Sequence, residues 1–272
     1  INGGSNVQYG EGQVTGRHLL VGGETTGNHY FTVRAVRKAV RFLKTMNAPR
    51  YEGSYWAIIH PDCSYDIQDD PDWKRPHEYK DTSNIYDDEI GKIAGVRFIE
   101  TTEAKVFHAD DLTEGARDLT VKSASGKVLT VNEAITTADA AKLAGREVVI
   151  GGALLEIESA SAAGAGSATI TLKEAPATTP TASTAIYPGE AGAKGRNVYS
   201  TLIMGAEAYG TTELTGGGLE HIVKPLGSAG TADPLNQRAT VGWKATKVAE
   251  RLVEAYMIRV ETTSTFDETP LT

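Results

Sequence analysis

The chain has 272 residues, enough for one large domain or two ordinary ones. Its formal net charge of -8 argues against broad binding to nucleic acid, because duplex affinity comes chiefly from Lys and Arg side chains that neutralise phosphates. The single cysteine, Cys63, excludes an internal disulfide. No apolar run approaches the roughly 20 residues of a membrane-spanning helix, so no membrane partner is expected.

The amino-terminal part begins without a clear pattern and then becomes strongly helical. Residues Ile1 to Asn28 are rich in Gly, Asn and Thr, which predicts a loop or a short extended arm. Thr32 to Met46 has helical spacing, with Val33, Val36, Val40 and Leu43 on one face and Arg34, Arg37, Lys38 and Arg41 on the other. We expect the apolar face to be buried. The basic face is either solvated or contacts phosphate or an acidic partner.

Two buried strands are predicted next. SYWAIIH, Ser54 to His60, is a short apolar run, and Pro61 is suited to the first position of a following helix. A polar surface loop, rich in aspartate, is expected to lead to Trp73. GVRFIET, Gly95 to Thr101, has apolar side chains for both faces of a strand and predicts the next member of the same sheet.

The middle of the chain has a different composition. No aromatic residue occurs from Ala109 through Ile186, and short strand patterns alternate with Gly and Pro. A single short helix is predicted over Thr137 to Leu143, and the run Ser159 to Ala168 is expected to form a hairpin tip. We predict a β-rich domain inserted at 105–197 between two parts of a main domain, 1–104 and 198–272, with its ends close together.

The last part returns to strand patterns. Val198 to Gly205 predicts a strand, followed by a turn or short helix at Ala206 to Tyr209. Period-two alternation from Ala239 to Thr263 predicts two long antiparallel strands, although AERLVEAY alone would be compatible with a helix. Trp243 and Met257 are expected to lie in the main core.

Three patterns resemble reactive or binding sites. His60 and Cys63 suggest a thiol nucleophile, but side chains three residues apart at a strand-to-helix junction point in different directions. Asp62, Asp66, Asp69, Asp70 and Asp72, with His77, would suit a hard cation, yet their spacing matches no EF-hand loop and favours a solvated acidic surface. Gly216 to Gly218 lacks the Lys and Ser/Thr of a phosphate-binding loop. We therefore assign no catalytic, cofactor or metal residue.

Four segments carry a resemblance to a known family. They are HPDCSYDIQDD (His60 to Asp70), IGKIAGVRFIETTEA (Ile90 to Ala104), VYSTLIMGAEAYGTTEL (Val198 to Leu214) and GTADPLNQRATVGWKA (Gly230 to Ala245). In these motifs and their order the chain resembles the major capsid proteins of tailed phages. The N-four-like branch, with the Hong Kong 97-type fold, is the most similar.

The resemblance implies an α+β capsid subunit with A-domain and P-domain elements. It also implies that the family's amino-terminal arm, E-loop and most of its spine helix lie outside this sequence. Copies would pack into hexamers and pentamers of an icosahedral virion shell around double-stranded DNA, assembled in the bacterial host cytoplasm. Scaffolding, portal or decoration proteins are further expected partners, and the protein would not be an enzyme.

Several residues are expected to shape the fold or the contacts between subunits. In the segment Gly230 to Arg238, Pro234 fixes its own φ and pushes Asp233 toward an extended conformation, which predicts a rigid corner. Arg238, Lys244, Arg251 and Arg259 are candidates for charge pairs with neighbouring copies. The full set of structural and interface candidates is Pro61, Gly205, Asp233, Pro234, Arg238, Trp243, Lys244 and Arg259.

Three alternative functions remain open at this point. A cellular nanocompartment shell of the same fold would enclose protein cargo instead of DNA. A hydrolase would use Cys63 with His60. An adhesion module in the insertion is disfavoured by its lack of aromatic side chains, which sugar-binding surfaces commonly use for stacking.

Overall fold

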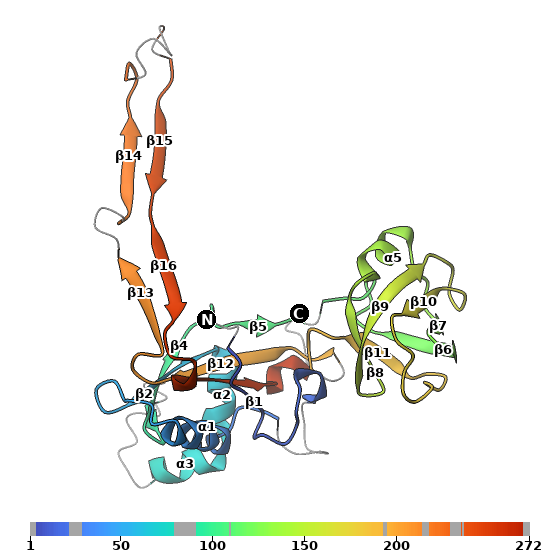
Figure 1. Ribbon diagram of the computed structural model, residues 1–272, viewed down its shortest axis with the longest axis horizontal. Coiled ribbons are helices and arrows are strands. Elements are labelled where there is room, and N and C mark those ends of the chain that lie inside the picture. The colour runs from blue at the N-terminus through green and yellow to red at the C-terminus, as the bar shows by residue number, and fades with distance from the viewer. Residues whose placement is uncertain are drawn as a thin grey trace.

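The computed structural model describes residues 4–21, 29–78, 91–108, 110–192, 195–213, 218–228, 235 and 237–268. It has three parts: an α+β body, a closed β-barrel and a long two-stranded arm (Figure 1). The barrel and the arm leave the body in different directions. None of the helices within the described ranges has both the length and the apolar character needed to cross a membrane.

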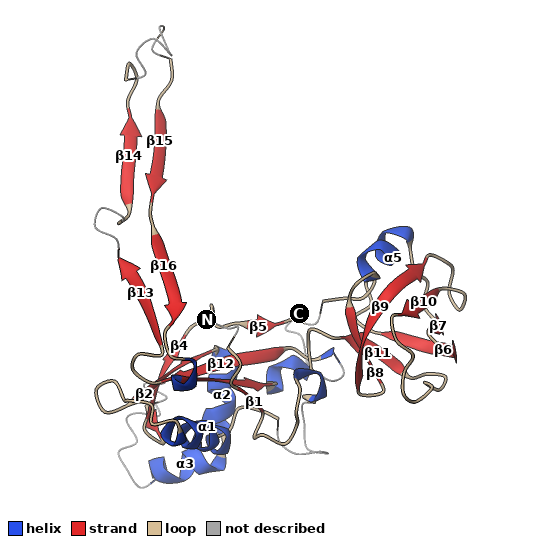
Figure 2. Ribbon diagram, viewed as in Figure 1, coloured by secondary structure: helices blue, strands red, loops and turns tan. Residues whose placement is uncertain are grey.

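The body is organised around a mixed sheet of seven strands (Figure 2). Its strands are β1 (Val7–Tyr9), β2 (Tyr55–Ile59), β3 (Lys92–Ile93), β4 (Val96–Glu100), β5 (Val106–Phe107), β12 (Val198–Met204) and β17 (Met257–Thr262). The order is β1-β17-β12-β2-β4-β3, and β5 also pairs with β12. The three strands expected in the body are confirmed. The first segment is only partly loop, since it supplies β1, parallel to β17, and a short 3-10 turn, η1 (Arg17–Leu19).

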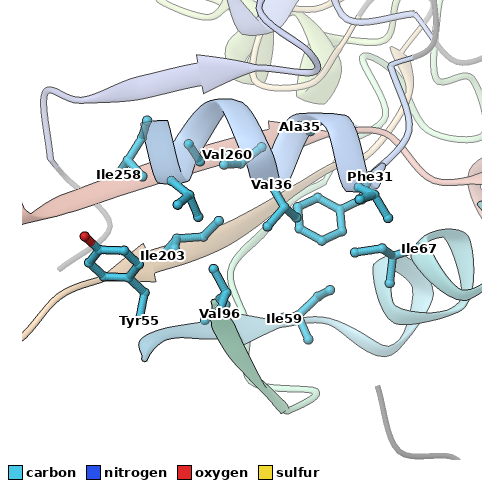
Figure 3. Close-up of a cluster of buried hydrophobic side chains, with 14 of the residues drawn as sticks. Phe31, Ala35, Val36, Tyr55, Ile59, Ile67, Val96, Ile203, Ile258 and Val260 are labelled. Carbon is cyan, nitrogen blue, oxygen red and sulfur yellow. The ribbon is translucent and has the colours of Figure 1, made fainter. Parts of the chain in front are cut away.

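Helix α1 (Val33–Thr45) covers one face of this sheet, as its spacing predicts (Figure 3). Val36 and Leu43 are fully buried among sheet side chains that include Ile203 and Val260. The Thr32 hydroxyl accepts a hydrogen bond from the amide of Ala35, 3.2 Å away, and so caps the helix. Burial of each large aliphatic side chain contributes roughly 1.5–3 kcal/mol, which outweighs the weak helix propensity of valine.

A helix begins at Pro61, as predicted, but the aspartates that follow lie in and between helices and not in the surface loop that we expected. Helix α2 (Pro61–Asp69) and helix α3 (Pro71–Glu78) each begin with a proline. Proline is favoured there because the missing amide hydrogen would have no partner inside the helix. Asp70 lies between the two helices, and its carboxylate accepts from the amide of Val33 at 2.9 Å, which ties this segment to the start of α1.

The barrel accounts for most of the aromatic-poor region. It is closed, in the order β10-β7-β6-β11-β8-β9. Its strands are β6 (Leu119–Ser125), β7 (Val128–Val131), β8 (Glu147–Ile150), β9 (Ala153–Ser161), β10 (Thr169–Leu172) and β11 (Ala185–Pro188). Helix α5 (Thr137–Leu143) and the hairpin between β9 and β10 are confirmed, whereas β11 follows a Pro- and Thr-rich stretch whose pattern gave no strand signal. Closure leaves no free sheet edge.

The chain enters and leaves the barrel through neighbouring segments. β5 leads toward it and β12 follows it, and they pair with Phe107 opposite Val198 and Val106 opposite Tyr199. This adjacency is what an inserted domain requires. The boundaries at 105 and 197 stay a prediction.

The arm replaces the pair of long strands expected between Ala239 and Thr263. β13 (Tyr209–Glu213) pairs with β16 (Lys247–Arg251), and β14 (Glu220–Lys224) pairs with β15 (Thr240–Lys244). β15 and β16 therefore follow each other along one side of the arm, and β17 returns to the sheet. The prediction that the two halves of this segment pair with each other is wrong. The preference for strands over a long helix holds, because only the 3-10 turn η4 (Glu254–Tyr256) is helical there.

Candidate functional site

The thiol of Cys63 is placed as a packing group. It is fully buried, and its sulfur lies 3.6 Å from the Thr262 hydroxyl. Burial raises the pKa of this thiol far above its ordinary value, so the nucleophilic thiolate does not form near neutral pH. His60 instead accepts from the amide of Asp62 at 3.3 Å and packs against Tyr199, with ring centroids 5.0 Å apart. The structure thus gives no support to a thiol-nucleophile site.

The acidic side chains line a pocket of about 300 Å³ beside α1, but they are engaged within the chain. Thr265 donates to Asp66 from its hydroxyl at 2.6 Å and from its amide at 3.3 Å. Asp69 pairs with Lys74. Across the described ranges, no group of three or more His, Cys, Asp or Glu side chains is arranged to hold a metal ion. The side chain of His77 lies outside the described residues.

The basic face of α1 is also partly neutralised within the chain. Arg34 lies 3.4 Å from a carboxylate oxygen of Glu11, and Arg37 lies 3.5 Å from Asp72. Lys38 donates to the backbone carbonyl of Glu11. These contacts indicate that the basic face of α1 helps to hold the first segment and α3 against α1.

Trp243 is not in the main core, and this corrects the expectation from its sequence. It lies on β15 in the arm and is 75% exposed, whereas Met257, the other residue expected in the core, is 5% exposed at the start of β17. Alternating polar and apolar residues are typical of any strand with one apolar face, whether or not that face is covered in the same chain. The tryptophan therefore belongs to a surface.

The outer half of the arm has two different faces. The register sets His221 opposite Trp243 and Val223 opposite Val241, so these four side chains share one face, the apolar face of the arm. Val223 is 53% exposed and Val241 is 71% exposed. Glu220, Lys224 and Lys244 lie on the opposite face with Ile222. An isolated two-stranded ribbon is marginally stable in water, so a ribbon with an uncovered apolar face is a candidate binding element.

A second candidate surface lies where the arm meets the body. It is a hollow of about 550 Å³, lined by Tyr51, Trp56, Tyr209 and the consecutive residues Met204 to Glu207. Tyr51 and Trp56 meet edge to face, with ring centroids 6.2 Å apart. Met204 packs in a small cluster on the sheet face opposite α1. The hollow is mainly apolar, with the exposed Glu207 as its one acidic residue.

Gly205 fixes the backbone beside this hollow. A Cβ at this position would lie 2.6 Å from the carbonyl oxygen of Pro49, closer than real side chains come. The amide of Ala206 donates to that same oxygen at 2.8 Å, and the amide of Gly205 donates to the Tyr256 carbonyl at 2.9 Å. A close approach of two chain segments therefore explains the glycine.

Arg259 belongs to an ion cluster within the body, not to an open surface. Its Nε lies 2.8 Å from the fully buried Glu261 carboxylate, which also accepts from Arg17 at 2.7 and 2.8 Å. The Arg17 guanidinium in turn covers the Phe107 ring. Arg251 lies 3.3 Å from Glu254. Arg259 and Glu261 lie two positions apart on β17, whereas Arg17, which shares the same carboxylate, comes from the first segment of the chain. Sequence alone therefore did not show this cluster.

The remaining predicted residues do not form one site. Pro61 begins α2. Lys244 is exposed on the charged face of the arm, and Arg238 is exposed just before β15. Asp233 and Pro234 lie outside the described residues, so the predicted corner is not described. Sequence reasoning missed the hollow, whose only local signal is Gly205 between a buried strand and the arm.

Comparison with known proteins finds a family model that matches most of the chain. Residues 3–212 match the protein family described as phage capsid protein. No curated protein matches the chain in sequence. Among solved structures, the acidic stable capsid of Helicobacter pylori bacteriophage KHP30 is similar, with a TM-score of 0.42 and 10% sequence identity. That match covers 91% of this chain and 63% of the other, so this chain spans less than two thirds of its length.

Proposed function

The chain belongs to the phage capsid protein family, and from this premise we propose that it acts as a major capsid protein. Membership makes it a structural protein of the virion and not an enzyme. Copies would assemble into the hexamers and pentamers of an icosahedral head that encloses double-stranded DNA. The match of residues 3–212 to the family is the observation that carries this proposal.

The finer assignment is to the Hong Kong 97-type fold in its N-four-like branch. The four sequence motifs support it, and so does a mixed sheet covered by a helix on one face. The barrel would be a domain inserted at 105–197, which the adjacency of β5 and β12 favours. Scaffolding, portal or decoration proteins would bind the assembled shell.

The negative net charge of the chain is compatible with a capsid shell that encloses DNA but binds it only weakly. The net charge is -8, and Arg34 and Arg37 on α1 already face Glu11 and Asp72. Few cations on this helix are thus left for phosphate, and binding that depends on counterion release would be weak. Affinity would instead lie in the contacts between copies, which repeat around each ring.

Electron microscopy of the protein, expressed alone and with a scaffold, tests the proposal. We expect hexamers, pentamers or closed particles, and particles from infected cells should contain double-stranded DNA. Particles filled with protein cargo would favour a nanocompartment shell instead. A protein that stays monomeric under every assembly condition would contradict both.

A further inference from the structure

The apolar face of the arm and the hollow at its base cannot meet within one chain. Trp243 lies on β15, which pairs with β14 in the outer half of the arm. The hollow lies at the other end of the arm, where β13 begins at Tyr209 next to β2 and β12 (Figure 1). Within the described residues, each copy therefore presents both an exposed apolar face on the arm and an apolar hollow at its base.

The hollow matches the chemistry of an indole ring. A tryptophan side chain combines a large apolar body with one N–H donor, which usually finds an acceptor when the ring is buried. Tyr51, Trp56 and Met204 offer aromatic and thioether surface. Glu207 adds a carboxylate acceptor, and this side chain forms no ion pair with another described residue.

Hydrogen bonds within the single chain already fix the backbone of the turn that carries Glu207. Hydrogen bonds from Gly205 and Ala206 anchor it to Tyr256 and Pro49. Glu207 itself has φ of 62°, a left-handed conformation that a residue with a side chain adopts at some energetic cost. Strained non-glycine residues cluster at binding sites, and a preformed site loses less entropy on association.

We propose that Trp243 of one subunit inserts into the hollow of a neighbouring copy and donates its indole N–H to the Glu207 carboxylate there. Val223 and Val241 would cover the rim beside it. The contact joins two different surfaces and is therefore heterologous, the type that closes rings when the rotation between copies allows it. The inference rests on the proposed function, because the occupant is a second copy of this chain.

Engineered disulfides between tagged copies test the contact and leave Trp243 in place. One copy carries His221→Cys, beside Trp243 on the apolar face, and the other carries Ala206→Cys in the hollow. Native Cys63 is buried and does not compete. Under mild oxidation we expect a disulfide-linked pair at least about tenfold more abundant than with Lys244→Cys, a matched position on the opposite face of the arm.

The affinity between copies gives a second readout. Trp243→Ala should lower the association constant at least about thirtyfold, as expected for a buried tryptophan anchor, while the exposed position leaves folding intact. Trp243→Phe should lose less, since it keeps an aromatic ring but lacks the donor. Sedimentation of the assembled and free fractions, with circular dichroism as the folding control, measures both variants.

The outcomes separate this contact from the function on which it rests. Assembled copies without the 221–206 disulfide would overturn the contact and leave the proposed function standing. Disulfides that form only between two His221→Cys copies would also overturn the contact. An association constant that Trp243→Ala leaves unchanged would overturn it as well. A chain that never associates would overturn both.

Discussion

The barrel and the arm are both built from antiparallel strands with alternating side chains, yet they place their apolar residues in opposite ways. In the barrel, Leu129, Ile170 and Ile186 point into a closed interior and are fully buried. In the arm, Val241 and Trp243 occupy similar positions in the pattern and are 71% and 75% exposed. The difference lies in closure, since six strands can surround a core and two cannot.

This contrast indicates which part of the molecule should be stable without contacts to another chain. Closure gives each barrel strand two neighbours and leaves no edge for another chain. Within the described residues, the arm consists of two-stranded pairs with an exposed apolar face, so contacts with another copy would add to its stability. In a capsid protein, that division is expected to separate a module that folds alone from an element that joins copies.

The largest expected effect comes from truncating matched aliphatic side chains in the two regions. Leu129→Ala should lower the free energy of unfolding by about 2–5 kcal/mol, because it leaves a cavity in a fully buried site. Val241→Ala, on the exposed face, should change it by less than about 0.5 kcal/mol in the unassembled chain. Urea titration measures both. Equal losses would remove the distinction between the barrel and the arm.

Alanine substitutions at two glycines, one at the base of the arm and one within it, should give a smaller difference in stability. Gly205→Ala should destabilise the chain by about 1–3 kcal/mol, since its Cβ would press on the Pro49 carbonyl oxygen. Gly242→Ala in the arm is the matched control, because nothing lies within 4 Å of a Cβ there. Thermal unfolding should shift for the first and hardly at all for the second. A tolerated Gly205→Ala would show that the base of the arm is not tightly fixed.

The smallest expected effect is a pH dependence of opposite sign in the body and the barrel. Burial raises the pKa of Asp66 above 3.8, and the hydrogen bond from Thr136 lowers the pKa of Asp139 below it. The stabilising contribution of Asp66 is therefore present below pH 3.8 and is lost as the pH rises. That of Asp139 is present above pH 3.8 and is lost as the pH falls.

Asparagine variants measure these two contributions. Relative to Asp66→Asn, the unaltered chain should lose stability as the pH rises above 3.8. Relative to Asp139→Asn, it should lose stability on acidification below about pH 4. Unfolding free energies at several pH values give both slopes. The same sign for both variants would refute the assignment of their environments.

The sequence predicted most elements where local pattern and burial agree. Helix α1, the central strands and α5 have spacing that matches the faces they bury. It failed for the partner of the strand that contains Trp243, because no strand was predicted at Glu220 to Lys224, where β14 lies. Alternation fixes which residues share a face, and only the tertiary structure decides whether anything covers that face.

The candidate site was predicted in part for the same reason. Trp243 and Gly205 were both singled out from the sequence as structural candidates, but the tryptophan was wrongly placed in the core. The hollow combines Tyr51 with Met204 and Glu207, which lie in a segment much further along the chain, so no short motif encodes it. Arg259 was assigned to a surface because the sequence does not show that β17 and η1 bring Arg259 and Arg17 together on the buried Glu261 carboxylate.

Hydrogen exchange of the free and assembled protein tests the central claim most directly. In the free chain, amides of β14 and β15 should exchange at least about a hundredfold faster than those of the barrel strands. On assembly the arm amides should slow markedly while the barrel amides stay unchanged. Arm amides that exchange equally fast in assembled particles would contradict the view that the arm is the element that joins copies.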